Sequence, residues 1–550
     1  MTPVEALQPA IALLGAGTVA ALTSRALRLS PMVGYILAGI VIGPFGLHAL
    51  SEGDTTHLLA ELGVVFLLFD IEGTSGSYLW ADPISISYIV VAGAEKNFEV
   101  IQPMRTYKAQ SRKSRCYEID AYLVNGLNPF EVEKEKLTNF QFIKKIHDEF
   151  LKWGKQGATF CSYNGYSYDF PLISANLHSQ LFSWIWIFNT QGASQIDLLP
   201  ICRNIDYYSP GTLKTDLNEK QNKIFRLASL CEKQNFPIKA AHTSSGDTEG
   251  LLNLFKHCAT KAPELFKKSL LFKHKKDVLP AITSQDYFCF SEFFFGKSRN
   301  VVGTFFSEGI FPGYYLVMDL KTDVEAFFSK KSKEELAKAL KGPPRPIKVV
   351  KANRNPLILD EAWATKNEDE YKAMGHDLLK KRSKIVKKMR KEFSERVVDI
   401  LRDQYEEKNS MDQTELLPEQ QMFTMRPSFD QKEDMNFFVA SDNIEQKQKI
   451  YQKFKKNNSL ILKHLAELQL VDEYDREAFT DNEYNEVRKR ISTRLLSTNN
   501  EPYITIPSQM ARADTLKIEV EESANKERRE AVHRLDAHLT KTADDHEKYL

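Results

Sequence analysis

The stretch "VVFLLFDIEGTSGSYLW", residues 64–80, decides the fold because it fits two incompatible structures. Up to Phe69 its apolar run is typical either of the end of a membrane helix or of a strand buried on both faces. In a strand, residues two positions apart point to the same side, so Asp70 and Glu72 would form one carboxylate pair while Ile71 faces away. A helix would separate the pair by about 200°. The turn-forming "GTSGS" that follows favours the strand.

Length and composition set limits on the rest of the chain. Its 550 residues exceed a single core, which favours about two to four domains. Lys and Arg (74) balance Asp and Glu (73), so the net charge of +1 does not indicate a nucleic-acid partner, and any basic surface must be local. The six cysteines form no C-x-x-C motif or close pair, which argues against zinc or disulfides and favours the reducing cytoplasm.

The first 62 residues differ from the rest. Segments 6–24 and 29–51 carry no Asp, Glu, Lys or Arg, and each is long enough to cross a bilayer. A cleavable leader would have a basic start and one short apolar core, whereas this start carries Glu5 and two apolar segments. Residues 1–62 therefore predict two to three hydrophobic, transmembrane-like helices.

The segments "SPMVGYILAGIVIGPFGLHAL" and "LAELGVVFLLFDI" resemble the amino-terminal helices of the monovalent cation:proton antiporter-2 family of potassium/proton antiporters. The resemblance ends near residue 70, inside the family's third helix, and so few helices cannot enclose an alternating-access path. Residues 1–62 are then either a real membrane anchor or the result of gene fusion or sequence assembly. We favour a chimera, because the joint falls at "FDI", which occurs both in this family and in the second family that the rest of the chain resembles.

Three more polar residues follow at positions that suit metal chemistry. "SYNGYSYDFPLI" contains Asp169, and "AAHTSSGDTEGLLNLF" contains His242 and Asp247 at the start of an expected amphipathic helix. Mg²⁺ prefers carboxylate oxygens, and two ions about 4 Å apart can bind the attacking and leaving oxygens of a phosphodiester displacement. Histidine, whose pKa is near neutral, can take the proton from the nucleophilic water.

In this order the motifs resemble the DEDDh 3′→5′ exonucleases, and more narrowly the bacterial exonuclease I family, from about Val64 to the carboxyl end. The matching segments include "FDIE", "SYNGYSYDFPLI", "QIDLLPICRNIDYYSP" and "FRLASLCEKQNFPIKAAHTSSGDTEG". The resemblance implies an α/β RNase H-like domain that binds two Mg²⁺ ions, with Mn²⁺ as an alternative. It implies these site residues: Asp70, Glu72, Asp169 and Asp247 as metal ligands, His242 as general base, and Glu72 and Arg226 in contact with substrate.

Two positions need comment. The family usually has Thr or a similar residue directly after the Glu, whereas here Gly73 comes before Thr74, which could shift the loop that meets the terminal nucleotide. Asp197 in "QIDLLP" could serve as a fifth acid, but we expect a structural role because the metal set is complete without it.

Beyond the catalytic domain the pattern changes twice. Residues 273–359 alternate short apolar runs with turns, which predicts a small antiparallel barrel or sandwich, interrupted by a helical insert at 325–342. The resemblance implies an SH3-like domain there. An aromatic cluster beside two basic residues is typical of single-strand binding, although most of its rings should be core: Phe288, Phe290, Phe293, Phe294, Phe295, Lys297 and Arg299.

From about residue 361 the chain is expected to be helical, with a basic face on the first long helix that could line a DNA groove or be merely solvated. The expected domains are then residues 1–62 (hydrophobic helices), 63–262 (exonuclease), 263–390 (SH3-like with insert) and 391–550 (helical).

The resemblance implies a Mg²⁺-dependent exodeoxyribonuclease that removes 5′-mononucleotides from the 3′ end of single-stranded DNA in repair and recombination. It further implies a single-stranded DNA-binding protein as partner, and we expect a cytoplasmic monomer, membrane-associated only if residues 1–62 are expressed. One alternative is another DEDDh enzyme that acts on RNA or as a proofreader. Another is a membrane-anchored exonuclease or a truncated antiporter.

Overall fold

The computed structural model describes residues 64–550 except 95–96, 191, 239, 331, 343, 367–368, 409–415, 458 and 522–524. The hydrophobic helices expected in residues 1–62 lie outside these described residues. Among the described helices, none is long and apolar enough to cross a membrane. The chain divides into two compact units, Met1–Phe66 with Val91–Ile101 and Leu67–Val90 with Gln102–Leu550. In the first unit, the rings of Phe66 and Phe98 meet edge to face with centroids 5.7 Å apart.

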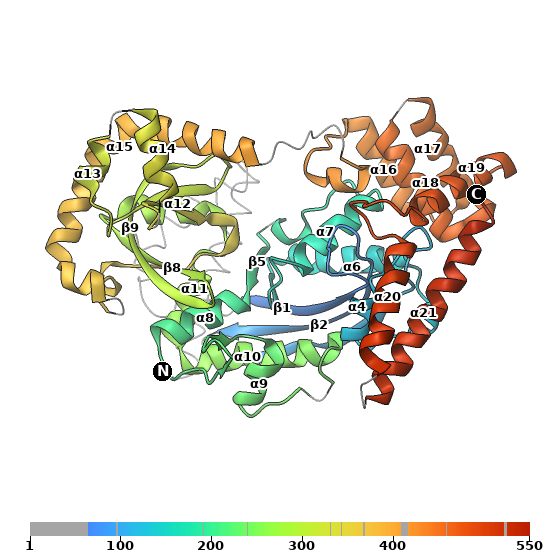
Figure 1. Cartoon of the computed structure of the whole chain (residues 1–550), viewed down its shortest axis with the longest axis horizontal. Coiled ribbons are helices and arrows are strands. Elements are labelled where there is room, and N and C mark those ends of the chain that lie inside the picture. The colour runs from blue at the N-terminus through green and yellow to red at the C-terminus, as the bar shows by residue number, and fades with distance from the viewer. Residues whose placement is uncertain are drawn as a thin grey trace, which may run out of the picture. The chain divides into compact units, whose positions relative to one another are not determined.

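The deciding stretch is a strand, as the sequence predicted: β1 is Val65–Gly73. It is the middle strand of a five-stranded sheet with the order β3-β2-β1-β4-β5 (Figure 1). Residues 66–69 are almost fully buried, as expected for a strand covered on both faces. The other strands of this sheet are β2 Pro83–Ala94, β3 Asn97–Lys108, β4 Thr159–Ser162 and β5 Ser194–Asp197.

Helices cover β1 through residues that alternate along the strand. The Phe69 ring packs edge-on against Phe150 of α6 (Asn139–Gly154) and Phe170 of α7 (Asp169–Ser179), at 5.3 and 5.5 Å. On the side of β2, the Thr248 hydroxyl of α10 (Ser244–Lys261) donates to the Ser87 carbonyl at 3.0 Å. The expected amphipathic helix is present as α10, whose apolar residues Leu251, Leu252 and Phe255 are buried.

A second five-stranded sheet, with the order β11-β10-β9-β8-β12, follows the α/β part and is antiparallel. Its strands are β8 Phe288–Phe294, β9 Lys297–Glu308, β10 Tyr314–Asp319, β11 Ile347–Lys351 and β12 Ile358–Leu359. The predicted helical insert is present as α13 Val324–Phe328 and α14 Lys333–Lys341. The predicted antiparallel strands and helical insert are therefore confirmed, and the strands form one five-stranded sheet, whereas an SH3-like barrel or sandwich stays a prediction.

The long basic helix is α15, Asp369–Lys408, which is broken at Gly375, where φ is +66°. The face of this helix opposite the expected basic face packs inward, because Leu379, Val386, Phe393 and Val397 are at most 2% exposed. The domain boundary expected at residue 390 falls inside this helix, and the one expected at 262 falls between α10 and α11 (Pro263–Leu270).

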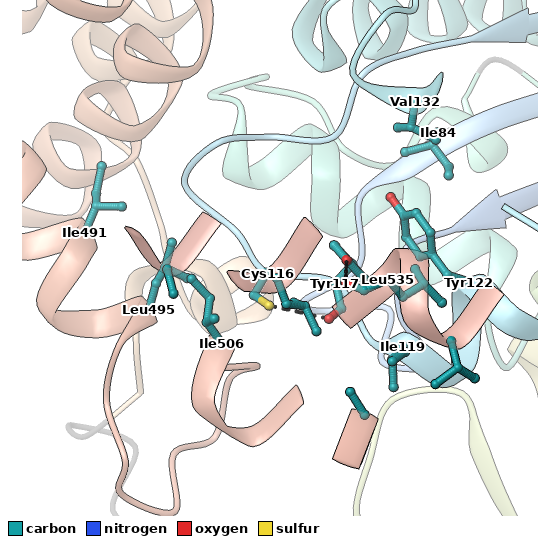
Figure 2. Close-up of a cluster of buried hydrophobic side chains, with 14 of the residues drawn as sticks. Ile84, Cys116, Tyr117, Ile119, Tyr122, Val132, Ile491, Leu495, Ile506 and Leu535 are labelled. Carbon is teal, nitrogen blue, oxygen red and sulfur yellow. Dashed lines mark hydrogen bonds between the residues drawn. The ribbon is translucent and has the colours of Figure 1, made fainter. Parts of the chain in front are cut away.

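The carboxyl-terminal region is helical, as predicted, and shares a core with the α/β part. Figure 2 shows this cluster, in which Ile84 and Tyr122 of the α/β part lie in one apolar core with Ile491, Ile506 and Leu535. The helices are α16 Phe429–Ala440, α17 Ile444–Lys456, α18 Leu460–Tyr474, α19 Asp481–Leu495, α20 Ile506–Glu521 and α21 Lys526–Glu547. Burial of this continuous apolar surface stabilises the contact between the two regions.

Candidate active site

Four of the predicted acids converge from three elements of the α/β part. Asp70 and Glu72 lie on β1, Asp169 is the first residue of α7, and Asp247 lies in the first turn of α10. Burial raises the pKa of Asp70 well above its usual value, and the negative charges of Asp169, Asp247 and Glu72 raise it further. We call this group of four side chains the carboxylate pocket.

Glu72 is held in place by the amino-terminal end of α10. The Ser244 backbone N–H donates to Glu72 Oε1 at 3.1 Å, and the Ser244 hydroxyl lies within hydrogen-bond distance of the Ser85 hydroxyl of β2, at 2.7 Å. Burial raises the pKa of Glu72, whereas hydrogen bonds from Ser85 and Ser244 and the charge of Lys108 lower it. The helix starts here because the Thr243 side chain caps it, accepting from the Gly246 N–H at 3.2 Å.

Asp169 is the most deeply buried acid of the pocket, with 4% of its surface exposed. Burial raises its pKa to about 7; a hydrogen bond from the Ser162 hydroxyl opposes this rise, and the charge of Asp197 adds to it. Asp197 itself caps α8 (Leu198–Tyr208) and accepts backbone N–H groups of Leu199, Asn164 and Tyr166. These three bonds support the structural role expected for Asp197.

His242 and Arg226 are both exposed, outside the buried group of acids. His242 has a left-handed backbone, φ +65°, two residues before α10. Burial raises the pKa of Asp247, while a hydrogen bond from the His242 backbone and the His242 charge lower it, so His242 lies beside Asp247. Arg226 precedes α9 (Leu227–Lys233), and the carbonyl of its neighbour Phe225 accepts from Tyr163 Oη at 2.7 Å.

The donor chemistry of the carboxylate pocket fits a divalent cation. Burial raises the pKa values of all four acids, and Asp70 is also opposed by the charges of the other three, so a cation among them would stabilise their charged forms. No three His, Cys, Asp or Glu side chains among the described residues are gathered tightly enough to hold a metal as they stand. The fit is therefore one of charge and ligand type, without a closed coordination shell.

Sequence reasoning missed the contact between Gly73 and Tyr168. The Tyr168 hydroxyl would lie 2.1 Å from a Cβ atom built on Gly73, so any larger residue at position 73 would displace the tyrosine. The same hydroxyl donates to the Ser75 carbonyl at 2.6 Å and so ties the loop after Glu72 to the residue before Asp169. The glycine that the sequence marked as unusual makes room for this tyrosine, and no local pattern links positions so far apart.

Comparison with known proteins finds two unrelated likenesses. A family model described as "Sodium/hydrogen exchanger, transmembrane" matches residues 10–71. The K(+) efflux antiporter 1, chloroplastic, of Arabidopsis thaliana is 55% identical over 42 residues, which are 8% of this chain and 4% of that protein. This likeness confirms the resemblance predicted for the first 70 residues, and its carboxyl end overlaps β1.

The second likeness is to exonuclease I proteins. Exodeoxyribonuclease I of Buchnera aphidicola subsp. Schizaphis graminum is 28% identical over 225 residues, which are 40% of this chain and 44% of that protein. The chain thus spans less than half of the length of this curated relative. Exonuclease I of E. coli, solved with a dA16 oligonucleotide, superposes with a TM-score of 0.69 at 15% identity and covers 87% of this chain and 100% of its own. The chain therefore resembles exodeoxyribonuclease I in sequence and has the exonuclease I fold over most of its length, behind an amino-terminal segment similar to transmembrane sodium/hydrogen exchangers.

Proposed function

We propose that this protein is a 3′→5′ exodeoxyribonuclease that hydrolyses single-stranded DNA to 5′-mononucleotides. The observation that carries the proposal is the convergence of Asp70, Glu72, Asp169 and Asp247, which are buried or half-buried and have raised pKa values. Perturbed acids of this kind concentrate at catalytic sites. Similarity to exodeoxyribonuclease I supports the assignment of the reaction.

In this proposal the four acids hold two Mg²⁺ ions, for which Mn²⁺ can substitute. Bound divalent cations stabilise charge on the reacting phosphate and lower the pKa of water. His242 accepts the proton of the attacking water, and its exposed position beside Asp247 leaves room for a strand end. Glu72 and Arg226 bind the terminal nucleotide.

The substrate and partner follow from the solved relatives. E. coli exonuclease I has been solved with a dA16 oligonucleotide, and another solved structure is titled as SSB/Exonuclease I in complex with the inhibitor CFAM. We infer that single-stranded DNA passes over the antiparallel β segment, an SH3-like domain, and the carboxyl-terminal helices, and that a single-stranded DNA-binding protein recruits the enzyme. We further infer a cytoplasmic monomer that acts in DNA repair.

Digestion of 5′-labelled oligonucleotides tests the proposal. Purified full-length chain should shorten single-stranded DNA from its 3′ end in Mg²⁺, should leave a blunt duplex largely intact, and should stop in EDTA. The Asp247→Asn variant is the matched control and should be inactive. Fastest degradation of RNA would instead identify an RNA-trimming enzyme of the same chemistry, and internal cleavage products would contradict an exonuclease.

The exchanger-like segment raises a second candidate, a nuclease tethered to a membrane. Residues 65–71 belong to the buried strand β1, so they cannot also complete a lipid-facing helix. We therefore favour the untethered enzyme. Full-length chain in washed membranes of the native host would support the tether, and a cytoplasmic product that begins near residue 60 would exclude it.

A further inference from the structure

A row of four hydroxyl groups adjoins the carboxylate pocket. It consists of Ser85 and Ser87 of β2, Thr106 of β3 and Ser244, the first residue of α10. Ser244 Oγ lies 2.7 Å from Ser85 Oγ and 2.9 Å from Ser87 Oγ. Ser87 Oγ in turn lies 2.8 Å from Thr106 Oγ1. The three serines are at most 3% exposed, so their hydroxyl groups bond to one another in the interior of the α/β part. We call these four side chains the hydroxyl row.

Glu72 receives hydrogen bonds from two members of the hydroxyl row. The Ser244 backbone N–H donates to Glu72 Oε1 at 3.1 Å, and the Ser85 hydroxyl is a second donor to the same carboxylate. Ser85 and Ser244 also contact each other, so the carboxylate, the sheet and the helix share one set of bonds. Glu72 therefore cannot turn without disturbing the contact between β2 and α10.

A second bond fixes the start of α10 to the same strand. The Thr248 hydroxyl donates to the Ser87 carbonyl at 3.0 Å, about one helical turn after Ser244. Asp247 lies between these two attachments. The attachment of Ser244 to the sheet therefore sets the place of Asp247 relative to Glu72.

The loop before α10 rests on the first turn of this helix. A Cβ atom on Gly246 would lie 2.1 Å from the carbonyl oxygen of Ala240, so only glycine permits so close an approach of the chain. The Thr243 hydroxyl donates to the same carbonyl at 2.7 Å. His242 belongs to this loop and is therefore positioned by the end of α10 that Ser244 attaches to the sheet.

Fold stability does not by itself explain the hydroxyl row. Replacing both partners of a buried hydrogen bond by apolar groups of the same shape can be nearly neutral for stability. A hydrogen bond also has a preferred direction, whereas hydrophobic burial has none. Direction matters for a carboxylate that binds a metal ion, and mutating the hydrogen-bond partners of metal ligands typically changes metal affinity about 10- to 100-fold.

Divalent cations differ in how strictly they require such direction. Mg²⁺ demands near-ideal octahedral geometry with ligands at about 2.0–2.1 Å, whereas Ca²⁺ accepts roughly six to eight oxygen ligands in flexible arrangements at about 2.3–2.6 Å. A carboxylate that is held by two donors suits the stricter ion. Loosening this carboxylate should therefore weaken the binding of Mg²⁺ more than that of Ca²⁺.

We propose that Ser85 and Ser244 are positioning residues that hold Glu72 at a fixed place relative to Asp247 and so favour Mg²⁺ over Ca²⁺ in the carboxylate pocket. This inference rests on the proposed function and adds to it a source of metal selectivity. Both serines act through Glu72, and neither is itself a proposed ligand.

Calorimetric titration of Mg²⁺, and separately of Ca²⁺, into the full-length chain without DNA tests the selectivity apart from catalysis. Ser244→Ala keeps the backbone N–H that donates to Glu72 but loses the hydroxyl. Mg²⁺ should then bind about 10- to 100-fold more weakly, and Ca²⁺ should be weakened by a smaller factor. Ser85→Ala leaves α10 unchanged and should shift the ratio of the two affinities in the same direction. Thermal unfolding in EDTA verifies that each titrated variant is folded.

Ser194→Ala is the matched control. Ser194 is likewise fully buried, and its Oγ lies 3.0 Å from Thr159 Oγ1 where β4 and β5 begin. This variant loses a comparable contact between hydroxyl groups and should keep the parent's ratio of Mg²⁺ to Ca²⁺ affinity.

Three results would overturn the proposal. An unchanged ratio in folded Ser85→Ala and Ser244→Ala, in a parent chain that degrades single-stranded DNA, would overturn the positioning role and leave the proposed function standing. The same shift of the ratio in Ser194→Ala would also overturn that role, because the loss of any buried hydroxyl would then suffice. A parent that binds neither ion would overturn both the selectivity and the metal chemistry of the proposed function.

Discussion

Two groups of buried acidic side chains in this protein have opposite electrostatic surroundings. The carboxylate pocket gathers acids whose pKa values are all raised. Glu419, which is 1% exposed, instead accepts from Arg494 Nη1 at 2.6 Å. Burial alone would raise the pKa of Glu419, but the nearby His464, 3.7 Å from Glu419 Oε1, and the charges of Arg494 and Arg115 outweigh burial and lower it.

The difference separates an acid that stabilises the fold from the acids that we propose to bind a metal ion. Glu419 connects the helical region to the α/β part, and its charge is compensated by residues from both. The carboxylate pocket accumulates negative charge that opposes folding, which a protein retains when a ligand or reaction requires it. Replacing one acid of the carboxylate pocket should therefore reduce activity without loss of stability, whereas replacing Glu419 should reduce stability.

The largest effect is expected on activity from Asp247→Asn. This change removes one proposed metal ligand and should reduce hydrolysis of single-stranded DNA by about 10³-fold or more. Thermal unfolding in EDTA should show equal or higher stability, because one repelling charge has gone. Retention of activity within tenfold of the parent would place the chemistry elsewhere.

Glu419→Gln is expected to lower the stability of the fold. Loss of the carboxylate leaves the Arg494 guanidinium without its buried partner, and breaking such a pair costs about 3–5 kcal/mol of unfolding free energy. Urea unfolding measures this cost, and Glu486→Gln, an exposed acid on the same helix as Arg494, should change it by less than about 0.5 kcal/mol. A Glu419→Gln protein as stable as the parent would contradict the distinction between an acid that stabilises the fold and acids that do not.

The pH dependence of the unfolding free energy should also distinguish the carboxylate pocket from Glu419. The pKa of Asp169 is about 7 in the folded protein, above its ordinary value of 3.8, so its contribution to stability is fully present below pH 4 and is lost as the pH rises to 7. That loss amounts to at most about 4 kcal/mol. Urea unfolding in EDTA should show that Asp169→Asn gains stability relative to the parent between pH 4.5 and 8. The control variant Asp544→Asn, at an exposed position, should show no such gain. A stability difference between Asp169→Asn and the parent that does not change with pH would contradict a raised pKa of Asp169.

A smaller effect is expected at Gly73. Gly73→Ala places a methyl group where the Tyr168 hydroxyl lies and should destabilise the fold by about 1–3 kcal/mol, as overpacked sites do. Tyr168→Phe should cost about 1 kcal/mol through its lost hydrogen bond to Ser75. The double variant should cost less than the sum, because phenylalanine lacks the clashing atom. Additive costs would show that the two positions do not compete for one space.

Much of the α/β part could be predicted from local pattern. The run before Asp70 predicts a strand, and the two-residue spacing of Asp70 and Glu72 predicts that both carboxylates lie on one side of it. The amphipathic pattern likewise predicted α10 and α15, since burial of one face repeats with the helical period.

What the sequence could not predict depends on contacts between distant residues. The Glu419 cluster joins residues hundreds of positions apart, and Tyr168 meets Gly73 across the sheet. Neither contact leaves a periodic trace in the sequence. The exposure of Phe295 was equally hidden, because an alternating aromatic run does not reveal which rings leave the core.

Calorimetric titration of Mn²⁺ into the full-length chain tests the central claim most directly, because that claim is that Asp70, Glu72, Asp169 and Asp247 together bind divalent cations. We expect saturable binding that is abolished or strongly weakened in Asp70→Asn and unchanged in Glu419→Gln under conditions where that variant remains folded. Absence of binding to the parent, or equal binding to Asp70→Asn, would contradict the account.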